Sequence, residues 1–138
     1  MIFRQKEISI KVPSRGFFIV TDKILNSVNI SDVNVGIINL FLKHTSSSLT
    51  INENVSPEVR IDMEEISSSL VPDGYNYNHS LEGADDMPAH FKSSMFGVSL
   101  NIPITNGKLN LGTWQGIYLN EHRNRPGVRK IVITVWGI

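Results

Sequence analysis

Cysteine is absent from this chain of 138 residues, and so is any excess of charge of one sign. Without cysteine the protein has no disulfides, no thiolate metal sites and no thiol catalysis, so histidine, aspartate and glutamate remain as its strong metal ligands. Thirteen basic and thirteen acidic side chains cancel, so no overall field attracts nucleic acid or a membrane surface. Any anionic partner must therefore be held by local groups.

Long apolar runs are missing as well. The first residues lack the apolar stretch of a signal peptide, and no run approaches the roughly 18 apolar residues that a membrane span needs. The sequence also contains no Walker phosphate loop, dinucleotide fingerprint or nucleophile elbow, which argues against a nucleotide-driven machine. We expect a cytoplasmic protein with no membrane and no nucleic-acid partner.

The apolar residues that are present predict roughly eight strands and three helices in mixed order. A chain of this length can bury a substantial core without disulfides or a structural metal, so we expect one domain, residues 1–138. Strands concentrated in the C-terminal half favour an α+β fold, a mainly antiparallel or mixed β-sheet sandwich with about three helices.

Several strands can be placed from the sequence. Glu7–Val12 alternates polar and apolar residues, and a turn leads to Phe17–Val20, so we expect these two strands to form a hairpin. The nearly continuous apolar run Val35–Leu42 predicts a central strand covered on both faces. Asn106-Gly107 is a strong hairpin signal. Trp114 is predicted to be a core aromatic, with the wall of a pocket as the alternative.

The clearest helix signal is Ser56-Pro57-Glu58, which combines a capping hydroxyl, a proline at the first helical position and an early carboxylate. Apolar residues then recur at steps of four, three and four, which predicts one buried face, and the charged residues are expected on a solvated face. The apolar residues are Val59, Met63, Ile66 and Leu70, and the charged ones are Arg60, Asp62, Glu64 and Glu65.

The richest chemistry lies in residues 78–94, which hold two imidazoles, three carboxylates, an ammonium and three hydroxyls. The first half of this stretch has no hydrophobic period, which is typical of a loop. Asp85 or Asp86 followed by Pro88 then predicts a helix start, and Gly97 its end. A loop of reactive side chains that runs into a helix N-terminus is a common arrangement for holding an anion.

All four histidines fall in polar segments at the ends of predicted elements. His79 and His90 are eleven residues apart, so they are not the paired ligands of a single zinc helix. A third ligand must come from elsewhere in the fold, and His122 is the candidate, with His44 as the alternative. Three neutral imidazoles with an open position are what a catalytic zinc site requires.

Groups that could hold a phosphate or carboxylate occur nearby in the sequence. Arg123 offers a planar fork, Lys92 a point charge, and the run Thr45–Ser48 a set of hydroxyls. An equally good interpretation of the hydroxyl run is a strand-end turn whose side chains cap backbone groups. Together these groups indicate a small phosphorylated or carboxylated ligand.

Three long segments, in this order, resemble the YjbQ-like family, which is also called the secondary thiamine-phosphate synthase family. The segments are His44–Asn54, Glu82–His90 and Leu111–Leu119 with Glu121-His122-Arg123. The resemblance covers nearly the whole chain. It implies an α+β domain that assembles as a homotrimer, with a histidine-rich cleft for a metal ion and an anion. For some members it implies a weak thiamine-phosphate synthase activity, in which a pyrimidine pyrophosphate condenses with a thiazole phosphate.

Carried over residue by residue, the resemblance implies roles for particular side chains. His79, His90 and His122 are the implied metal ligands, with His44 as a base or fourth ligand. Asp86 is expected to orient His90 or the helix N-terminus. Phosphate is expected at Arg123 and the hydroxyls of Ser46, Ser47 and Ser48, with Lys92 nearby. The implied cofactor is a divalent metal; imidazole ligands favour zinc, and magnesium is the alternative.

Two other functions fit the same residues. One is a non-catalytic metal- or ligand-binding protein, because imidazole ligands do not match the magnesium chemistry usual for pyrophosphate release. The other is a metal-dependent hydrolase.

Overall fold

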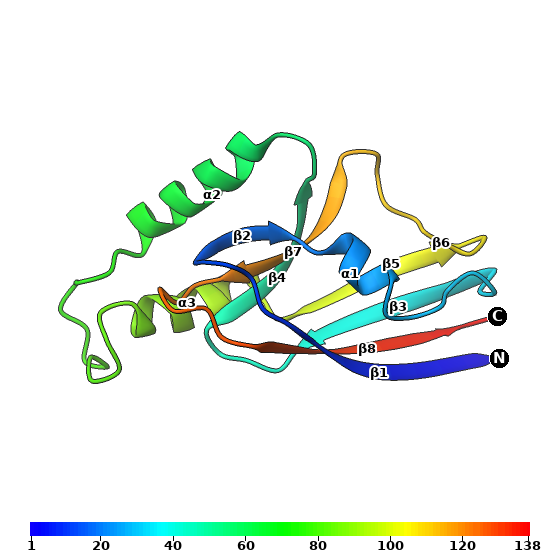
Figure 1. Ribbon diagram of the computed structural model, residues 1–138, viewed down its shortest axis with the longest axis horizontal. Coiled ribbons are helices and arrows are strands. Elements are labelled where there is room, and N and C mark those ends of the chain that lie inside the picture. The colour runs from blue at the N-terminus through cyan, green and yellow to red at the C-terminus, as the bar shows by residue number, and fades with distance from the viewer.

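The computed structural model, which describes residues 1–138, contains eight strands and three helices in two antiparallel sheets (Figure 1). The α+β sandwich expected from the sequence is therefore confirmed. In chain order the elements are β1 (Ile2–Ile10), β2 (Gly16–Ile19), α1 (Thr21–Leu25), β3 (Val35–Leu42), β4 (Ser47–Glu53), α2 (Pro57–Leu70), α3 (Asp86–Phe96), β5 (Ser99–Thr105), β6 (Lys108–Leu109), β7 (Gln115–Glu121) and β8 (Arg129–Gly137).

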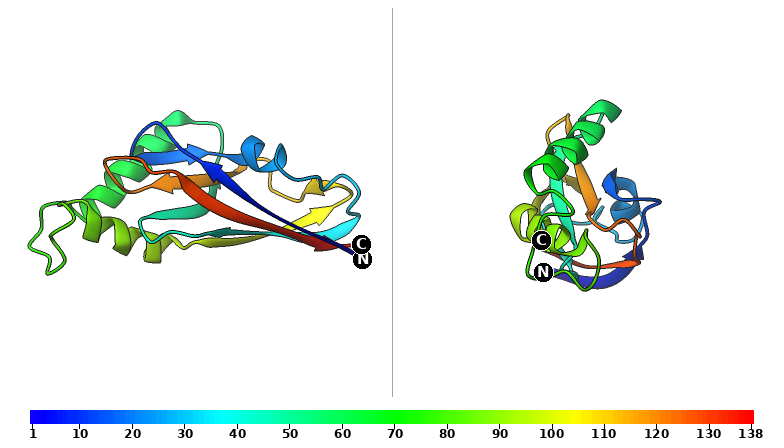
Figure 2. Two further views of the ribbon diagram at one scale, coloured as in Figure 1. Left: turned by 60° about the horizontal axis from the view of Figure 1, so that its bottom comes forward. Right: turned by 90° about the vertical axis from the view of Figure 1, so that its left-hand side faces the viewer.

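The larger sheet has the strand order β1-β8-β3-β5-β6, and the smaller one has the order β2-β7-β4. Apolar side chains of both sheets form one core of 17 buried residues, including Leu40 and Ile133 from the larger sheet and Leu49 and Leu119 from the smaller one. Alternation along each strand sends every second side chain into this core. The two termini lie side by side at one end of the molecule (Figure 2).

Helices α2 and α3 cover the smaller sheet, where α2 packs on β2 and α3 packs on β4. In the views of Figures 1 and 2, the loop between these helices projects from the end of the molecule opposite the termini. This loop carries the first part of the reactive stretch, so the fold places that stretch at one end of the sandwich. None of the helices has the length and apolar character needed to cross a membrane.

The predicted turn at Asn106-Gly107 is confirmed. It joins β5 to β6, and both residues have positive φ, 51° and 77°, the conformation that this dipeptide accepts with little strain. Gly107 is needed for a second reason, because a Cβ atom there would lie 2.7 Å from the carbonyl oxygen of Ser31.

The predicted hairpin between the first two strands is wrong. β1 pairs with β8 in the larger sheet, whereas β2 pairs with β7 in the smaller one. The connecting turn carries the chain from one sheet to the other, and Arg15 at its end pairs with Glu64 and Asp73. A turn signal marks a change of direction but does not identify the partner strand.

The prediction for Val35–Leu42 is half right. β3 is the middle strand of the larger sheet, but only one of its faces is covered. Ile38 and Leu40 are fully buried, whereas Val35 and Phe41 are exposed on the opposite face, because all three helices lie elsewhere. Trp114 is also exposed, so its assignment to the core is wrong.

Helix α2 forms where expected, but it is turned about its axis relative to the prediction. Ile66 and Leu70 are exposed, whereas Ser67 is buried and Arg60 and Glu64 are half-buried. The ion pair between Glu64 and Arg15 holds the polar side of the helix against the protein. The space between α2 and the smaller sheet is therefore more polar than the helix pattern predicts.

Candidate metal-binding site

Three side chains converge at the start of α3. The Nε2 atom of His79 lies 2.7 Å from Oδ2 of Asp86, and Nε2 of His90 lies 3.1 Å from the same oxygen. Ligand atoms from these three residues all lie within 4.8 Å of one another. The Asp86 side chain is 6% exposed, while those of His79 and His90 are 44% and 33% exposed. The carboxylate is thus buried, whereas the two imidazoles are partly exposed to solvent.

Local structure explains this convergence. Asp86 and His90 are four residues apart on α3, so they project from the same face one turn apart. His79 comes from the loop before the helix, which turns back at Gly83 with φ of +111°. A Cβ atom at Gly83 would meet Oδ1 of Asp85 at 3.1 Å, so the turn requires glycine.

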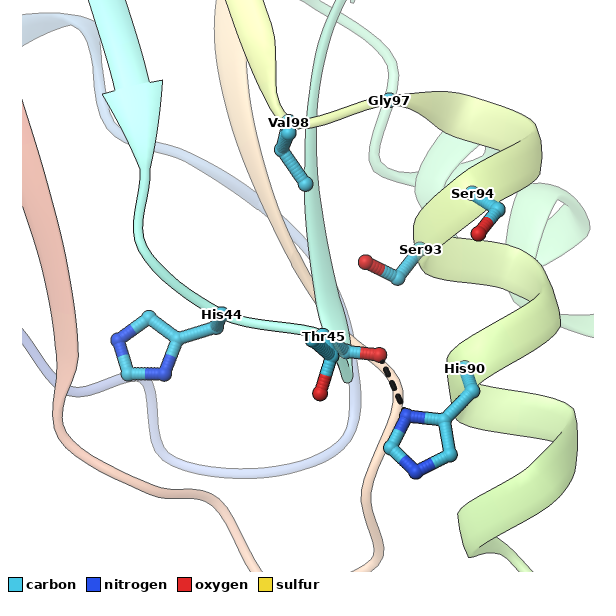
Figure 3. Close-up of a pocket in the computed structure, with 7 residues that line it drawn as sticks. All are labelled: His44, Thr45, His90, Ser93, Ser94, Gly97 and Val98. Atoms are coloured by element: carbon cyan, nitrogen blue, oxygen red, sulfur yellow. Dashed lines mark hydrogen bonds between the residues drawn. The ribbon is translucent and has the colours of Figure 1, made fainter.

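The orientation of His90 is fixed by a backbone carbonyl. Its Nδ1 lies 2.7 Å from the carbonyl oxygen of Thr45, in the connection between β3 and β4 (Figure 3). A carbonyl only accepts, so Nδ1 must carry a proton and donate. Neutral His90 then directs the lone pair of Nε2 at the Asp86 carboxylate, where only a second proton or a metal ion makes the contact favourable.

A guanidinium holds the carboxylate from the other side. Arg123 donates through Nη1 to Oδ1 of Asp86, and through Nε to Oδ2 of Asp85 at 3.0 Å. Burial by itself raises the pKa of Asp86, but the hydrogen bond with His79 and the charges of His90 and Arg123 outweigh it and hold the pKa below its usual range. Asp86 is therefore an anion at neutral pH with Oδ2 directed at the two histidines.

A pocket of about 540 Å³ adjoins this group. Figure 3 shows His44 and Thr45 on one side and His90, Ser93 and Ser94 on α3 on the other; Gly97 and Val98 complete the lining. The Nε2 atom of His44 accepts a hydrogen bond from the backbone N–H of Lys130 at 2.7 Å, so in neutral His44 the proton is on Nδ1. Burial, followed by the charge of Arg129, lowers the pKa of His44.

His122 lies apart from this group. It is fully buried, its Nε2 is 2.8 Å from the hydroxyl of Ser48, and its ring stacks on Phe96 with centroids 5.7 Å apart. Burial, with the nearby charges of Lys92 and Arg15, lowers the pKa of His122 to about 3. The imidazole is therefore neutral at physiological pH.

The expected phosphate-binding groups are also turned inward. Ser47 and Ser48 are fully buried, and the hydroxyl of Ser46 accepts a hydrogen bond from Arg129 at 3.0 Å. Lys92 is fully buried on α3, and its amine has no hydrogen-bond partner. Burial, followed by the charge of Arg15, lowers the pKa of Lys92.

The structure thus brings together two of the three histidines assigned to the metal. Asp86, which was expected to orient His90, occupies the place expected for the third histidine. The pocket hydroxyls come from Thr45, Ser93 and Ser94 rather than from Ser46–Ser48. The spacing could have indicated the α3 serines, since they follow His90 by three and four residues and so share its helix face.

Together, the fold and the site define an α+β sandwich with a candidate metal site at the N-terminus of a helix. The family model described as UPF0047 protein YjbQ-like matches residues 6–138, and the chain belongs to this family. The UPF0047 protein YjbQ of Escherichia coli O157:H7 is 52% identical over 134 residues, which cover 96% of this chain and 97% of the relative. A UPF0047 protein of Synechocystis is 44% identical, over 98% of this chain and 94% of the relative.

Solved structures show the same fold. An uncharacterised YjbQ/UPF0047 protein from Clostridium acetobutylicum superposes with a TM-score of 0.85 at 37% identity and covers 95% of this chain and 99% of its own. A conserved hypothetical protein from Thermus thermophilus gives a TM-score of 0.82 at 31% identity, over 93% and 97% of the two chains. Both are described as uncharacterised or hypothetical, so they support the family and the fold but name no activity.

Proposed function

We propose that this protein is a metal-dependent enzyme that acts on a small phosphorylated molecule in the pocket beside α3. The observation that carries the proposal is the convergence of His79, Asp86 and His90, of which His90 also lines that pocket. Two imidazole nitrogens and one carboxylate oxygen are a common set of protein ligands in catalytic metal sites with open positions.

The residues fit a transition metal better than magnesium. Imidazole nitrogens favour zinc and its neighbours, whereas magnesium prefers a shell of oxygens. The Thr45 carbonyl fixes the proton of His90 on Nδ1, which leaves Nε2 free to ligate, and such outer hydrogen bonds are typical of metal-ligating histidines. Arg123 restricts Asp86 to a single free oxygen. Zinc is therefore the metal we propose.

When bound, the metal would supply positive charge to a phosphate or pyrophosphate group. This charge matters because no lysine or arginine lines the pocket, and the Arg123 guanidinium already pairs with Asp85 and Asp86. Ser93 and Ser94 offer hydroxyls that can donate to phosphate oxygens. His44, whose Nε2 is held by the Lys130 N–H, presents Nδ1–H as a further donor.

The specific reaction that the family resemblance implies is thiamine-phosphate synthesis. A pyrimidine pyrophosphate would bind with its leaving group toward the metal and condense with a thiazole phosphate. Displacement of pyrophosphate needs charge stabilisation at the leaving group rather than a covalent nucleophile, and the site offers that type of help. We propose this activity as weak, since the pocket has no cationic side chain of its own.

A metal-dependent hydrolase is the second candidate. Three protein ligands leave room for water at a zinc ion, and His44 lines the same pocket as His90. A panel of phosphoesters and amides, assayed with zinc-loaded protein, separates the two activities by their products. Metal binding without turnover of any of these compounds would favour a non-catalytic metal-binding protein instead.

The first experiment is elemental analysis of protein purified without a histidine tag. We expect nearly one transition metal ion per chain in the wild type and little in the His79→Ala and His90→Ala variants, because each loses a ligand. His122→Ala is the matched control, and its metal content should stay near that of the wild type if the variant folds. Equal metal content in all four proteins would refute the site.

Turnover is tested with the same proteins. We expect His90→Ala to lose thiamine-phosphate synthesis while its circular dichroism spectrum stays unchanged. Unaltered turnover in that variant would refute a catalytic role for the site.

We also propose a homotrimer, as the resemblance implies. Exposed Phe3, Val35 and Phe41 on the open face of the larger sheet support an interface between copies. Light scattering coupled to size exclusion measures the mass directly, and a monomer of 15.5 kDa would contradict the proposal.

A further inference from the structure

A second polar region lies between the smaller sheet and the helices that cover it, away from the histidine–carboxylate group. All seven buried polar side-chain atoms that lack a hydrogen-bond partner belong to elements of this layer or to the residue that directly follows one. They are Oγ of Ser47, Oδ1 of Asn54, Nη1 of Arg60, Oε2 of Glu64, Nζ of Lys92, Oδ1 of Asn120 and Nδ1 of His122. Buried polar atoms are almost always paired, so such a concentration indicates a missing partner.

These groups belong to one neighbourhood. The charges of Arg15 and Glu64 act on the pKa of Lys92, and those of Lys92 and Arg15 act on the pKa of His122. Arg15 also bonds directly to Glu64 at 2.7 Å. Arg15 and Glu64 therefore form the centre of this region, and the charge of Arg15 reaches Lys92 and His122.

A groove of about 490 Å³ opens onto this centre from the surface, between β2 and α2. We call it the α2 groove; Arg15, Phe17, Phe18, Arg60, Ile61 and Glu64 are among the residues that line it. One part of the lining is apolar and the other is charged. This volume and this mixture of surfaces are typical of a site for a small molecule.

The charges favour an anion. The guanidinium of Arg15 is already shared between Glu64 and Asp73, whereas Nη1 of Arg60 and Nζ of Lys92 have no partner. Glu65, which also lines the groove, is exposed, so solvent screens its charge. Oε2 of Glu64 also lacks a partner, but this carboxylate already pairs with Arg15 through Oε1. Arg60 is therefore the cation in the groove that has no ion pair, and the partner it lacks is an acceptor with negative charge.

We propose that the α2 groove is a second ligand site, which binds a small organic anion with a carboxylate or phosphate group on an apolar body. The anionic group lies against Arg60, and the apolar body lies on Phe17, Phe18 and Ile61. This site is separate from the metal site and does not depend on the function proposed for it.

The test is an NMR titration of the metal-stripped protein with phenyl phosphate, benzoate and inorganic phosphate. We expect saturable shifts of the backbone amides of Phe17, Arg60 and Glu64 with phenyl phosphate or benzoate, and weaker ones with inorganic phosphate, which lacks the apolar body. The stronger of the two aromatic probes identifies the anionic group.

Variants make the test specific. Arg60→Gln should raise the dissociation constant of the probe about tenfold, because a charge-assisted hydrogen bond is lost. Arg125→Gln, which removes an exposed guanidinium outside the groove, should leave it unchanged. The double variant His79→Ala/His90→Ala should also bind as the wild type does, which separates this result from the fate of the metal site.

Two outcomes would overturn the proposal. One is the absence of saturable shifts at the groove with all three probes, which would leave ordered water as the partner of the buried atoms. The other is binding that Arg60→Gln does not weaken, or shifts centred on His79 and His90.

Discussion

His90 lies on α3 and His122 stacks on Phe96 of the same helix, yet only His90 is placed to bind a metal ion. His90 is partly exposed, donates to a carbonyl and faces a carboxylate, so its second nitrogen is directed at an anion. His122 is fully buried, meets a serine hydroxyl and the ring of Phe96, and has a pKa lowered to about 3. The comparison teaches that an imidazole becomes a candidate ligand through its neighbours rather than through its position in the sequence.

The largest expected effect is the loss of folding stability when the pH is lowered far enough to protonate buried His122. The pKa of His122 in the folded state is about 3, below the value near 6.5 of an unfolded histidine. Between these two values the unfolded state binds more protons, so the free energy of unfolding falls as the pH is lowered from 6.5 to 3. The stability is fully present above pH 6.5, and about 3–5 kcal/mol is lost by pH 3.

Urea unfolding of the wild type and His122→Gln at pH 7 and pH 4 isolates this contribution. Glutamine cannot titrate, so the difference in unfolding free energy between the two proteins should change by about 3 kcal/mol between these pH values. A difference that does not depend on pH would mean that His122 is not held neutral by burial. The contrast with His90 would then lose its basis.

The next largest effect concerns the metal site that contains His90. Arg123 contacts Asp86 and Asp85 but neither histidine, so we describe it as a positioning residue. Arg123→Gln should weaken zinc binding about 10- to 100-fold, the usual range for partners that orient metal ligands. Competition with a chromophoric chelator measures the affinity, and Arg125→Gln is the matched control.

If Arg123→Gln keeps the zinc affinity of the wild type while His79→Ala loses it, then Asp86 is positioned by the helix alone. The thermal unfolding midpoint of Arg123→Gln distinguishes loss of the site from loss of the fold. A variant with a normal midpoint and weakened zinc binding would support the positioning role.

Much of the fold could be predicted from the sequence, because its signals are local. The hydrophobic period predicted most strands, and Asn106-Gly107 predicted the β5–β6 turn. Ser56-Pro57 predicted the start of α2, although the Ser56 hydroxyl donates to Glu58 rather than capping the helix. Strand partners and the rotation of α2 depend on contacts between distant residues. The Arg15–Glu64 pair, which holds the polar side of α2 inward, joins residues 49 positions apart and has no local signal.

In the candidate site, too, the local arrangement could be predicted from the sequence and the long-range contacts could not. His79, Asp86 and His90 lie within twelve residues, and a loop that enters a helix brings them together, so the sequence pointed to them. The direction of the side chains was not predictable. Ser47, Ser48 and His122 occupy strand ends, as the sequence indicated, but they face the covered side of the smaller sheet or the core, and no composition rule reveals that choice.

The smallest effect concerns Lys92, which lies two residues from His90 and yet is fully buried without a hydrogen-bond partner. Methionine has a similar length and no polar atom to desolvate, so Lys92→Met should raise the free energy of unfolding by about 1–2 kcal/mol at pH 7. The pKa of Lys92 is lowered by burial in the folded state. The wild type therefore gains stability as the pH rises toward 10.5, and the advantage of Lys92→Met should shrink over that range. Denaturant unfolding at pH 7 and pH 10 measures both the stability difference between the two proteins and its change with pH.

A variant less stable than the wild type would show that the amine has a stabilising partner in solution. A more stable variant would mean that the chain keeps an unfavourable buried amine, as proteins do where a group serves binding rather than folding.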